Sequence, residues 1–218
     1  MSFDQCFGAT PAPHFHTPAI CHRRVATTGL VSHGASSPQR ATLEEFVRRE
    51  FRAHFGARIR QFMPELLGLH GPDGSVRAVV GCRSAAAEPL FVETYTREPI
   101  EVALASLNGF FVPREDIVEI GSLACRNATA AVAIVRALVP HLLRAGFSWV
   151  VFTGADTVMN VFRHLGLTPH ALCPADPALL GEARYDWGTY YDHEPHVMAG
   201  RIADGMAPTR IRATRRTQ

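Results

Sequence analysis

The stretch Ile117–Leu167, with the sequence IVEIGSLACRNATAAVAIVRALVPHLLRAGFSWVVFTGADTVMNVFRHLGL, decides the fold of this chain. Its β-branched start predicts a strand over 117–125, and Gly121 inside that strand indicates a bulge or a close backbone approach. Residues 128–143 are apolar on nearly all sides, which predicts a buried helix. A second apolar strand over 147–153 and a second helix follow. The stretch therefore predicts a strand–turn–helix–strand–helix unit that holds a ligand at its central turn.

Regular elements are also predicted before this unit. Thr42 followed by Glu45 forms a capping-box pattern, and apolar residues near helical spacing predict an amphipathic helix over 42–57. The run Gly71-Pro72-Asp73-Gly74 predicts a turn that leads into a strand over 76–82. A further helix is expected from Pro99 to Asn108, because Gly109 is a typical helix end.

After the unit, short strands are expected near 168–173 and 197–202, with a brief helix opened by Asp176-Pro177 between them. Alternation of strands and helices predicts an α/β (α+β) fold with a mixed central sheet. The 218 residues and 47% hydrophobic content fit one globular domain, which we place at 41–203. Residues 1–40 are expected to be a poorly ordered lead-in, and 204–218 a basic, frayed tail.

Composition narrows the function classes. A net charge of +2 gives no case for a nucleic-acid partner, and no apolar run approaches the roughly 20 residues of a membrane span. The five cysteines are odd in number and lack C-x-x-C spacing, which favours a reducing, cytoplasmic setting over a disulfide framework. The N-terminus lacks the pattern of a secretory signal. Histidines at 14, 16, 193 and 196 have no carboxylates at ligand spacing, so we expect no metal site.

The turn at the centre of the unit has the chemistry of an anion site. The first turn of a helix carries free backbone N–H groups, and small residues let a phosphate approach them. An arginine can add charge and hydrogen bonds. The residues of this turn are Arg126, Asn127, Ala128, Thr129, Ala130 and Ala131. Spacing alone leaves open the alternative that this is an ordinary helix start without a ligand, because many buried helices begin with small residues.

The order of these elements resembles the central half of the GNAT superfamily of N-acetyltransferases. The turn of that superfamily begins with Gln or Arg and ends with Gly or Ala, which Arg126 and Ala131 match, whereas Thr129 replaces its first glycine. The resemblance implies a GNAT-like sheet whose strands splay around the turn, with acyl-CoA or a carrier-protein phosphopantetheine thioester in the gap. Backbone N–H groups of Leu123 and Cys125 would orient the pantetheine. We also assign Asn160 to this donor site.

Glu119 is the candidate general base. A glutamate at this place in the strand has that role in the histone-acetylating branch of the superfamily, and a carboxylate among apolar residues gains proton affinity. A solvent-facing or arginine-paired glutamate is the structural alternative. The usual acid of the superfamily, a tyrosine in the second helix, falls on Phe162. The candidates for the acid are therefore Tyr190, Tyr191 and His193.

Over about 51–202 the chain also resembles the thermostable hemolysin family. The residues that carry this resemblance are Phe62–Leu67, Glu88–Tyr95, Val118–Ala124, Asp176–Gly181 and Trp187–Pro195. Among them, Glu65, Glu93 and Tyr95 are candidates for holding an amine, as acidic residues do in acyl-homoserine lactone synthases; the alternative for the two glutamates is a rim position balanced by arginines.

These observations predict an N-acyltransferase with acyl-CoA or an acyl carrier protein as donor and a small-molecule amine as acceptor. A membrane-lytic cytolysin, which the family name implies, and a non-catalytic thioester-binding protein are the alternatives.

Overall fold

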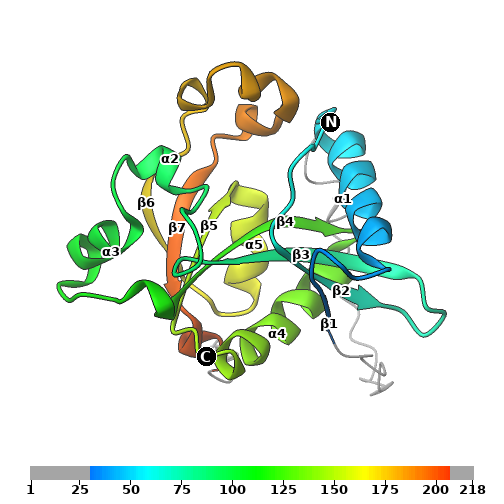
Figure 1. Cartoon of the computed structure of the whole chain (residues 1–218), viewed down its shortest axis with the longest axis horizontal. Coiled ribbons are helices and arrows are strands. Elements are labelled where there is room, and N and C mark those ends of the chain that lie inside the picture. The colour runs from blue at the N-terminus through cyan, green and yellow to red at the C-terminus, as the bar shows by residue number, and fades with distance from the viewer. Residues whose placement is uncertain (1–29, 207–218) are drawn as a thin grey trace, which may run out of the picture.

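The computed structural model describes residues 30–206 and contains one seven-stranded mixed sheet in the order β1-β2-β3-β4-β5-β7-β6 (Figure 1). The strands are β1 (Val31–His33), β2 (Glu65–His70), β3 (Val76–Ser84), β4 (Ile117–Cys125), β5 (Trp149–Gly154), β6 (His170–Pro174) and β7 (His196–Arg201). Only β4 and β5 pair in parallel, because a helix connects them; the other neighbours are antiparallel.

Five α-helices accompany the sheet within the described residues: α1 (Arg40–Phe55), α2 (Glu93–Thr96), α3 (Ile100–Asn108), α4 (Ala128–Arg144) and α5 (Asp156–His164). Figure 1 shows α1 above and α4 below the part of the sheet formed by β2, β3 and β4. Each packs an apolar stripe on the strands, with Leu43 and Val47 buried on α1 and Ile134 and Leu138 buried on α4.

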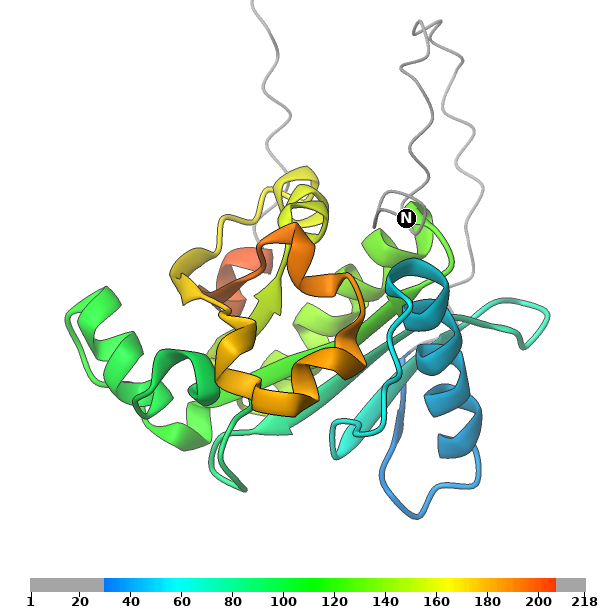
Figure 2. The ribbon, with the colours of Figure 1, turned by 90° about the horizontal axis from the view of Figure 1, so that it is seen from above.

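The described part of the chain also contains four 3₁₀ segments: η2 (Arg114–Asp116), η3 (Pro177–Trp187), η4 (Tyr190–His193) and η5 (Ile202–Met206). Seen from above (Figure 2), η3 and η4 lie between α1 and α2. The ring of Trp187 packs on Phe51 of α1 and on Phe91, just before α2. These segments therefore close the space above the middle of the sheet.

Most predicted elements are confirmed. The turn at 71–74 joins β2 and β3, α3 ends at the left-handed Gly109, and the central unit has the predicted order of strand and helix. The bulge predicted in β4 is also present: the register with β3 shifts between Val79 and Gly81, and Ser122 has a φ of 50°. A Cβ on Gly121 would lie 2.4 Å from Met63 Cε, which explains the glycine next to the bulge.

The capping box predicted at Thr42 is wrong. Helix α1 begins at Arg40, the N-cap residue is Gln39, and the Thr42 N–H donates to the Gln39 carbonyl. Arg40 explains the earlier start, because its guanidinium donates to the carbonyls of Met63 and Pro64 at 2.8 and 2.7 Å. The second helix of the central unit, α5, begins after the N-cap residue Ala155.

The expected lead-in overlaps the described chain only at residues 30–40. Within it, β1 pairs with β2 through Val31, Ser32 and His33, so this part belongs to the sheet rather than to a poorly ordered segment. The expected tail is described as far as Met206, where η5 ends. Residues 1–29 and 207–218 lie outside the described residues.

Candidate functional site

The site is built where two neighbouring strands part. Pairing between β4 and β5 ends at Ile120 and Phe152. Beyond that point β4 continues along β3 to Cys125, while β5 continues along β7 to Gly154. A gap therefore opens between the C-terminal ends of two parallel strands, directly before the turn into α4.

Backbone groups of β4 point into this gap. The Arg126 N–H donates to the Arg77 carbonyl on β3 at 3.0 Å. Because successive residues of a strand direct their N–H groups to opposite sides, the N–H of Cys125 points away from β3. Ala124 pairs with Val79, so the N–H of Leu123 is also directed toward the gap.

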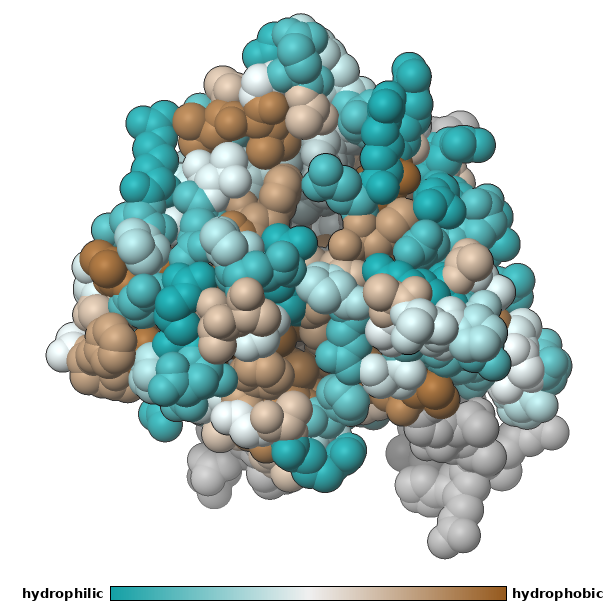
Figure 3. Space-filling view, viewed as in Figure 1, coloured by the Kyte–Doolittle hydropathy of each residue, from teal (hydrophilic) through white to brown (hydrophobic). Residues whose placement is uncertain are grey.

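A cavity of about 140 Å³ occupies the gap and the space above it. Figure 3 shows this face hollowed near its middle, with apolar side chains at the border. The polar groups in the lining come from Gln61, Arg83, Glu119, Ser122, Thr153 and three tyrosines, whereas aromatic and aliphatic side chains form the rest. The apolar lining residues are Phe51, Phe62, Met63, Phe91, Ile120, Leu123, Phe152, Val158, Phe162 and Trp187.

Glu119 is the buried charge of this cavity, with only 2% of its surface exposed. Its two oxygens accept hydrogen bonds from the N–H groups of Phe91 and Val92, each at 2.9 Å. Arg83, opposite on β3, approaches to 3.7 Å. Burial raises the pKa of Glu119, while these hydrogen bonds and Arg83 act against that rise. The carboxylate is held rigidly and has a higher proton affinity than an exposed one.

Three tyrosines from distant parts of the chain meet in the same lining. The hydroxyls of Tyr95 and Tyr191 are hydrogen-bonded to each other, and the Tyr190 hydroxyl donates to the Thr153 carbonyl at 3.3 Å. Burial raises the pKa of all three, that of Tyr191 to about 12. Each hydroxyl therefore keeps its proton at neutral pH.

His193, predicted with these tyrosines, is not part of the cavity lining. Its ring packs against Phe55 of α1 with centroids 5.8 Å apart. The structure thus places Tyr190 and Tyr191 in the same cavity lining as Glu119 and leaves His193 outside it.

The turn into α4 is capped by its own side chain. Asn127 accepts a hydrogen bond from the Ala130 N–H at 2.9 Å, and its carbonyl accepts the first helical bond from Ala131. Among the described residues, the N–H groups of Ala128 and Thr129 have no such acceptor. Fewer backbone N–H groups can therefore bind an anion than the predicted range from Arg126 to Ala131 implies. The side chain of Arg126 is exposed beside the free N–H groups.

The remaining predicted residues lie elsewhere. Asn160 is exposed on α5 and accepts a hydrogen bond from Arg163 at 2.7 Å, while Val158 and Phe162 of the same helix line the cavity. Glu65 accepts a hydrogen bond from Ser32 at the start of β2, away from the cavity lining.

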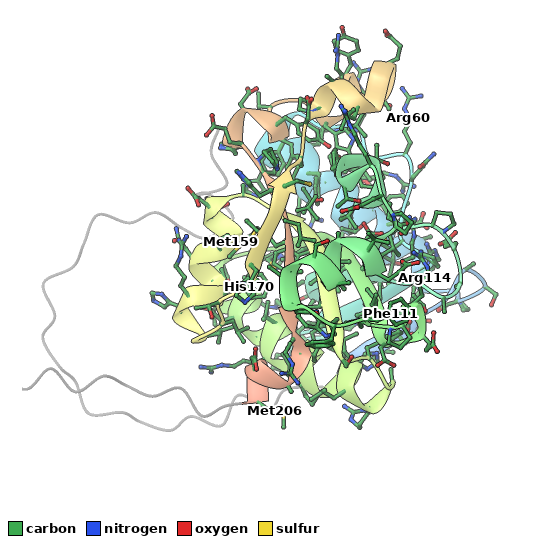
Figure 4. All side chains as sticks on the ribbon, turned by 90° about the vertical axis from the view of Figure 1, so that its left-hand side faces the viewer. Arg60, Phe111, Arg114, Met159, His170 and Met206 are labelled. Carbon is green, nitrogen blue, oxygen red and sulfur yellow. The ribbon has the colours of Figure 1, made fainter. Side chains whose placement is uncertain are left out.

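Glu93 points away from the cavity toward Arg114, which Figure 4 shows on the side of the molecule that carries α3. It accepts from Arg114 at 2.6 Å and from the N–H groups of Leu90 and Ile100. Burial raises its pKa, but these hydrogen bonds outweigh burial and leave the pKa of Glu93 lowered. This carboxylate connects α2, α3 and η2. Its position agrees with the alternative given for it above, a carboxylate balanced by an arginine, and not with an amine-binding role.

Arg83, Phe91 and Trp187 are among the lining residues that the sequence did not assign to the site. Arg83 reaches Glu119 only because β3 and β4 pair in this register, which no local pattern encodes. Trp187 lies in a segment dense in aromatic and polar residues, and that density was the available signal.

Within residues 30–206, no three His, Cys, Asp or Glu side chains gather as metal ligands would. None of the helices there has the length and apolar content that crossing a membrane requires.

Comparison with solved structures defines the fold class. The chain superposes on TofI, solved in a ternary complex with an inhibitor and MTA, with a TM-score of 0.55 and 13% identity, covering 83% of this chain and 97% of TofI. FeeM, an N-acyl amino acid synthase from uncultured soil microbes, gives a TM-score of 0.55 at 14% identity, covering 81% and 92%. The AHL synthase LasI gives 0.53 at 12% identity, covering 79% and 90%. The fold is therefore GNAT-like, as predicted.

The family follows from the sequence. Residues 33–206 match the thermostable hemolysin family, and the chain belongs to it. No curated protein matches the sequence.

Proposed function

We propose that this protein is an N-acyltransferase that moves an acyl group from a pantetheine thioester to a small-molecule amine. The observation that carries the proposal is the buried carboxylate of Glu119 on the wall of an apolar cavity, at the point where β4 and β5 part. The fold shared with an N-acyl amino acid synthase and an AHL synthase supports it.

The donor would lie in the gap between the strands. Its thioester carbonyl would accept from the N–H groups of Leu123 and Cys125, which are directed there and would stabilise the developing oxyanion. Its phosphate would meet Arg126 and the N–H groups of Ala128 and Thr129. Because Asn127 occupies the Ala130 N–H, this turn suits the single phosphate of a carrier-protein arm better than the diphosphate of CoA.

The acceptor would enter from the side of the aromatic residues. Phe91, Tyr95 and Trp187 offer ring surfaces that favour a cation, and Glu119 supplies the counter-charge. Glu119 would take one proton from the ammonium, and the neutral amine would then attack the thioester carbon. The tetrahedral intermediate would collapse to the amide with loss of the pantetheine thiolate, and the second nitrogen proton would replace the one that the tyrosine pair gives to that thiolate.

The thiolate would take its proton from the tyrosines. Tyr95 and Tyr191 share one hydrogen bond, so one of the two hydroxyls still has a proton to donate toward the cavity. Tyr190 already donates to Thr153 and would act less directly. The tyrosine pair would thus supply the acid that α5 cannot supply, because Phe162 stands at the position of the usual tyrosine.

The test is a panel of acyl-CoA and acyl-carrier donors with release of free thiol as readout, with and without amines. Amine-dependent release would support transfer. Donor binding without release would favour a thioester-binding protein instead. Leakage of dye from liposomes, measured in parallel, would favour the lytic activity in the family name.

A further inference from the structure

A second apolar cavity lies behind the first. It encloses about 60 Å³ and is lined by residues of α4, β5, β7 and η5, among them Leu138, Val139 and Leu142. The two cavities share three lining residues: Ile120, Phe152 and Phe162. Ile120 and Phe152 are also the last pair of residues that joins β4 to β5. The cavities therefore meet where the strands begin to part.

Two stacked rings separate them. The centroids of Phe152 and Phe162 are 4.9 Å apart, and the ring planes are inclined by 28°. The ring of Phe152 also fills the space beside Gly154, where an added Cβ would lie 3.0 Å from it. Phe162 is carried by the short helix α5, so a change in its side-chain rotamer needs no change in the sheet.

We infer that the second cavity is the binding site for the distal part of a long, unbranched acyl chain, and that Phe152 and Phe162 set the accepted chain length. The inference rests on the proposed function, because it gives the chain of the thioester donor a direction. With the thioester carbonyl at Leu123, the chain would run past Ile120 and between the rings.

The chemistry of the second cavity fits a hydrocarbon. Its deep wall consists of aliphatic side chains of α4 and β5, whereas its polar members, Thr168, Arg201 and Asp204, come from later segments near the surface. Transfer of each methylene from water to such a site improves binding about fourfold. A donor whose chain reaches the second cavity should therefore have a higher kcat/KM than a short-chain donor.

Two substitutions block the second cavity without touching the first. Val139→Phe enlarges a half-buried side chain of α4 that lines only the second cavity. Gly200→Val adds a side chain to the second cavity from β7, where an added Cβ would contact only Pro169, at an ordinary distance of 3.6 Å. Val132→Phe, two turns before Val139 on α4 and outside both linings, is the matched control.

The experiment compares kcat/KM for butanoyl and dodecanoyl donors in these variants. We expect the wild type and Val132→Phe to prefer dodecanoyl, and Val139→Phe and Gly200→Val to lose at least about tenfold of that preference with the butanoyl rate retained, since exclusion of two methylenes is sufficient for that loss. An equal preference in all four proteins would overturn the inference while leaving acyl transfer intact.

A binding measurement separates this inference from the proposed function. It uses a non-reactive thioether analogue of dodecanoyl-pantetheine, with calorimetry on the same folded variants. Binding that both blocking substitutions weaken would support the second cavity even if no amine were acylated. Binding that they leave unchanged would overturn it.

Discussion

Replacing Glu119 by Gln changes one atom of a buried side chain and tests the proposed base. Both carboxylate oxygens accept a backbone N–H at 2.9 Å, from Phe91 and Val92. A glutamine can accept only one of them and directs its own NH₂ toward the other. That loss of a buried hydrogen bond costs about 1–3 kcal/mol of unfolding free energy. Arg83 keeps a partner, because it also lies 3.0 Å from Glu88.

Turnover should fall much further than stability. Loss of a positioned general base lowers the rate about 10²-fold or more. Binding of the thioester donor should change little, because the groups assigned to it lie on the other part of β4. The assay is amine-dependent thiol release, with urea unfolding to show that the variant is folded at the assay temperature.

Glu93→Gln is the matched control. It makes the same change in the adjoining segment and removes similar hydrogen bonds, to Leu90, Ile100 and Arg114, from a carboxylate outside the cavity lining. It should lose comparable stability and keep turnover within about threefold of the wild type. Equal turnover in Glu119→Gln and the wild type, or equal loss in both variants, would refute the reasoning.

Three further predictions follow from the same geometry. Turnover should decline as pH falls through the raised pKa of Glu119, since the base must be ionised, and a pH–rate profile of Glu119→Gln should lack this acid limb. Arg114→Ala should lower the free energy of unfolding by about 2 kcal/mol near neutral pH, because it removes hydrogen bonds to a charged group. This loss should shrink as pH falls through the lowered pKa of Glu93, because a depressed carboxyl pKa stabilises the fold only while the group is ionised; urea titrations at two pH values check this. Asn127→Gly should release the Ala130 N–H at a cost of a few tenths of a kcal/mol, so the KM of acyl-CoA should fall while that of acyl-phosphopantetheine stays the same; an identical change for both donors would contradict the assignment of this turn.

The central unit could be predicted because its signals are local. The β-branched start of β4, the apolar run of α4 and the glycines that follow the helices each determine structure within a few residues. The bulge was also predictable, since a glycine inside an apolar strand is itself a local signal. The structure gives the reason for this glycine, because Met63 leaves no room for a Cβ at Gly121.

Other features depend on contacts between distant segments. Arg40 begins α1 early through carbonyls more than twenty residues away. Glu93 and Glu119 look alike in the sequence, each a carboxylate among apolar residues, yet one pairs with Arg114 outside the cavity and the other lines it. The meeting of Tyr95 with Tyr191 likewise follows from how η4 packs over the sheet. Residue type was therefore readable from the sequence, whereas the partner of each polar group was not.

The claim that β4 and β5 open around a pantetheine thioester can be tested most directly by a crystal structure with the non-reactive dodecanoyl-pantetheine analogue. We predict its carbonyl within hydrogen-bond distance of the Leu123 or Cys125 N–H and its reacting carbon next to Glu119. An analogue bound elsewhere on the protein, with the gap between the two strands filled by side chains, would contradict the account.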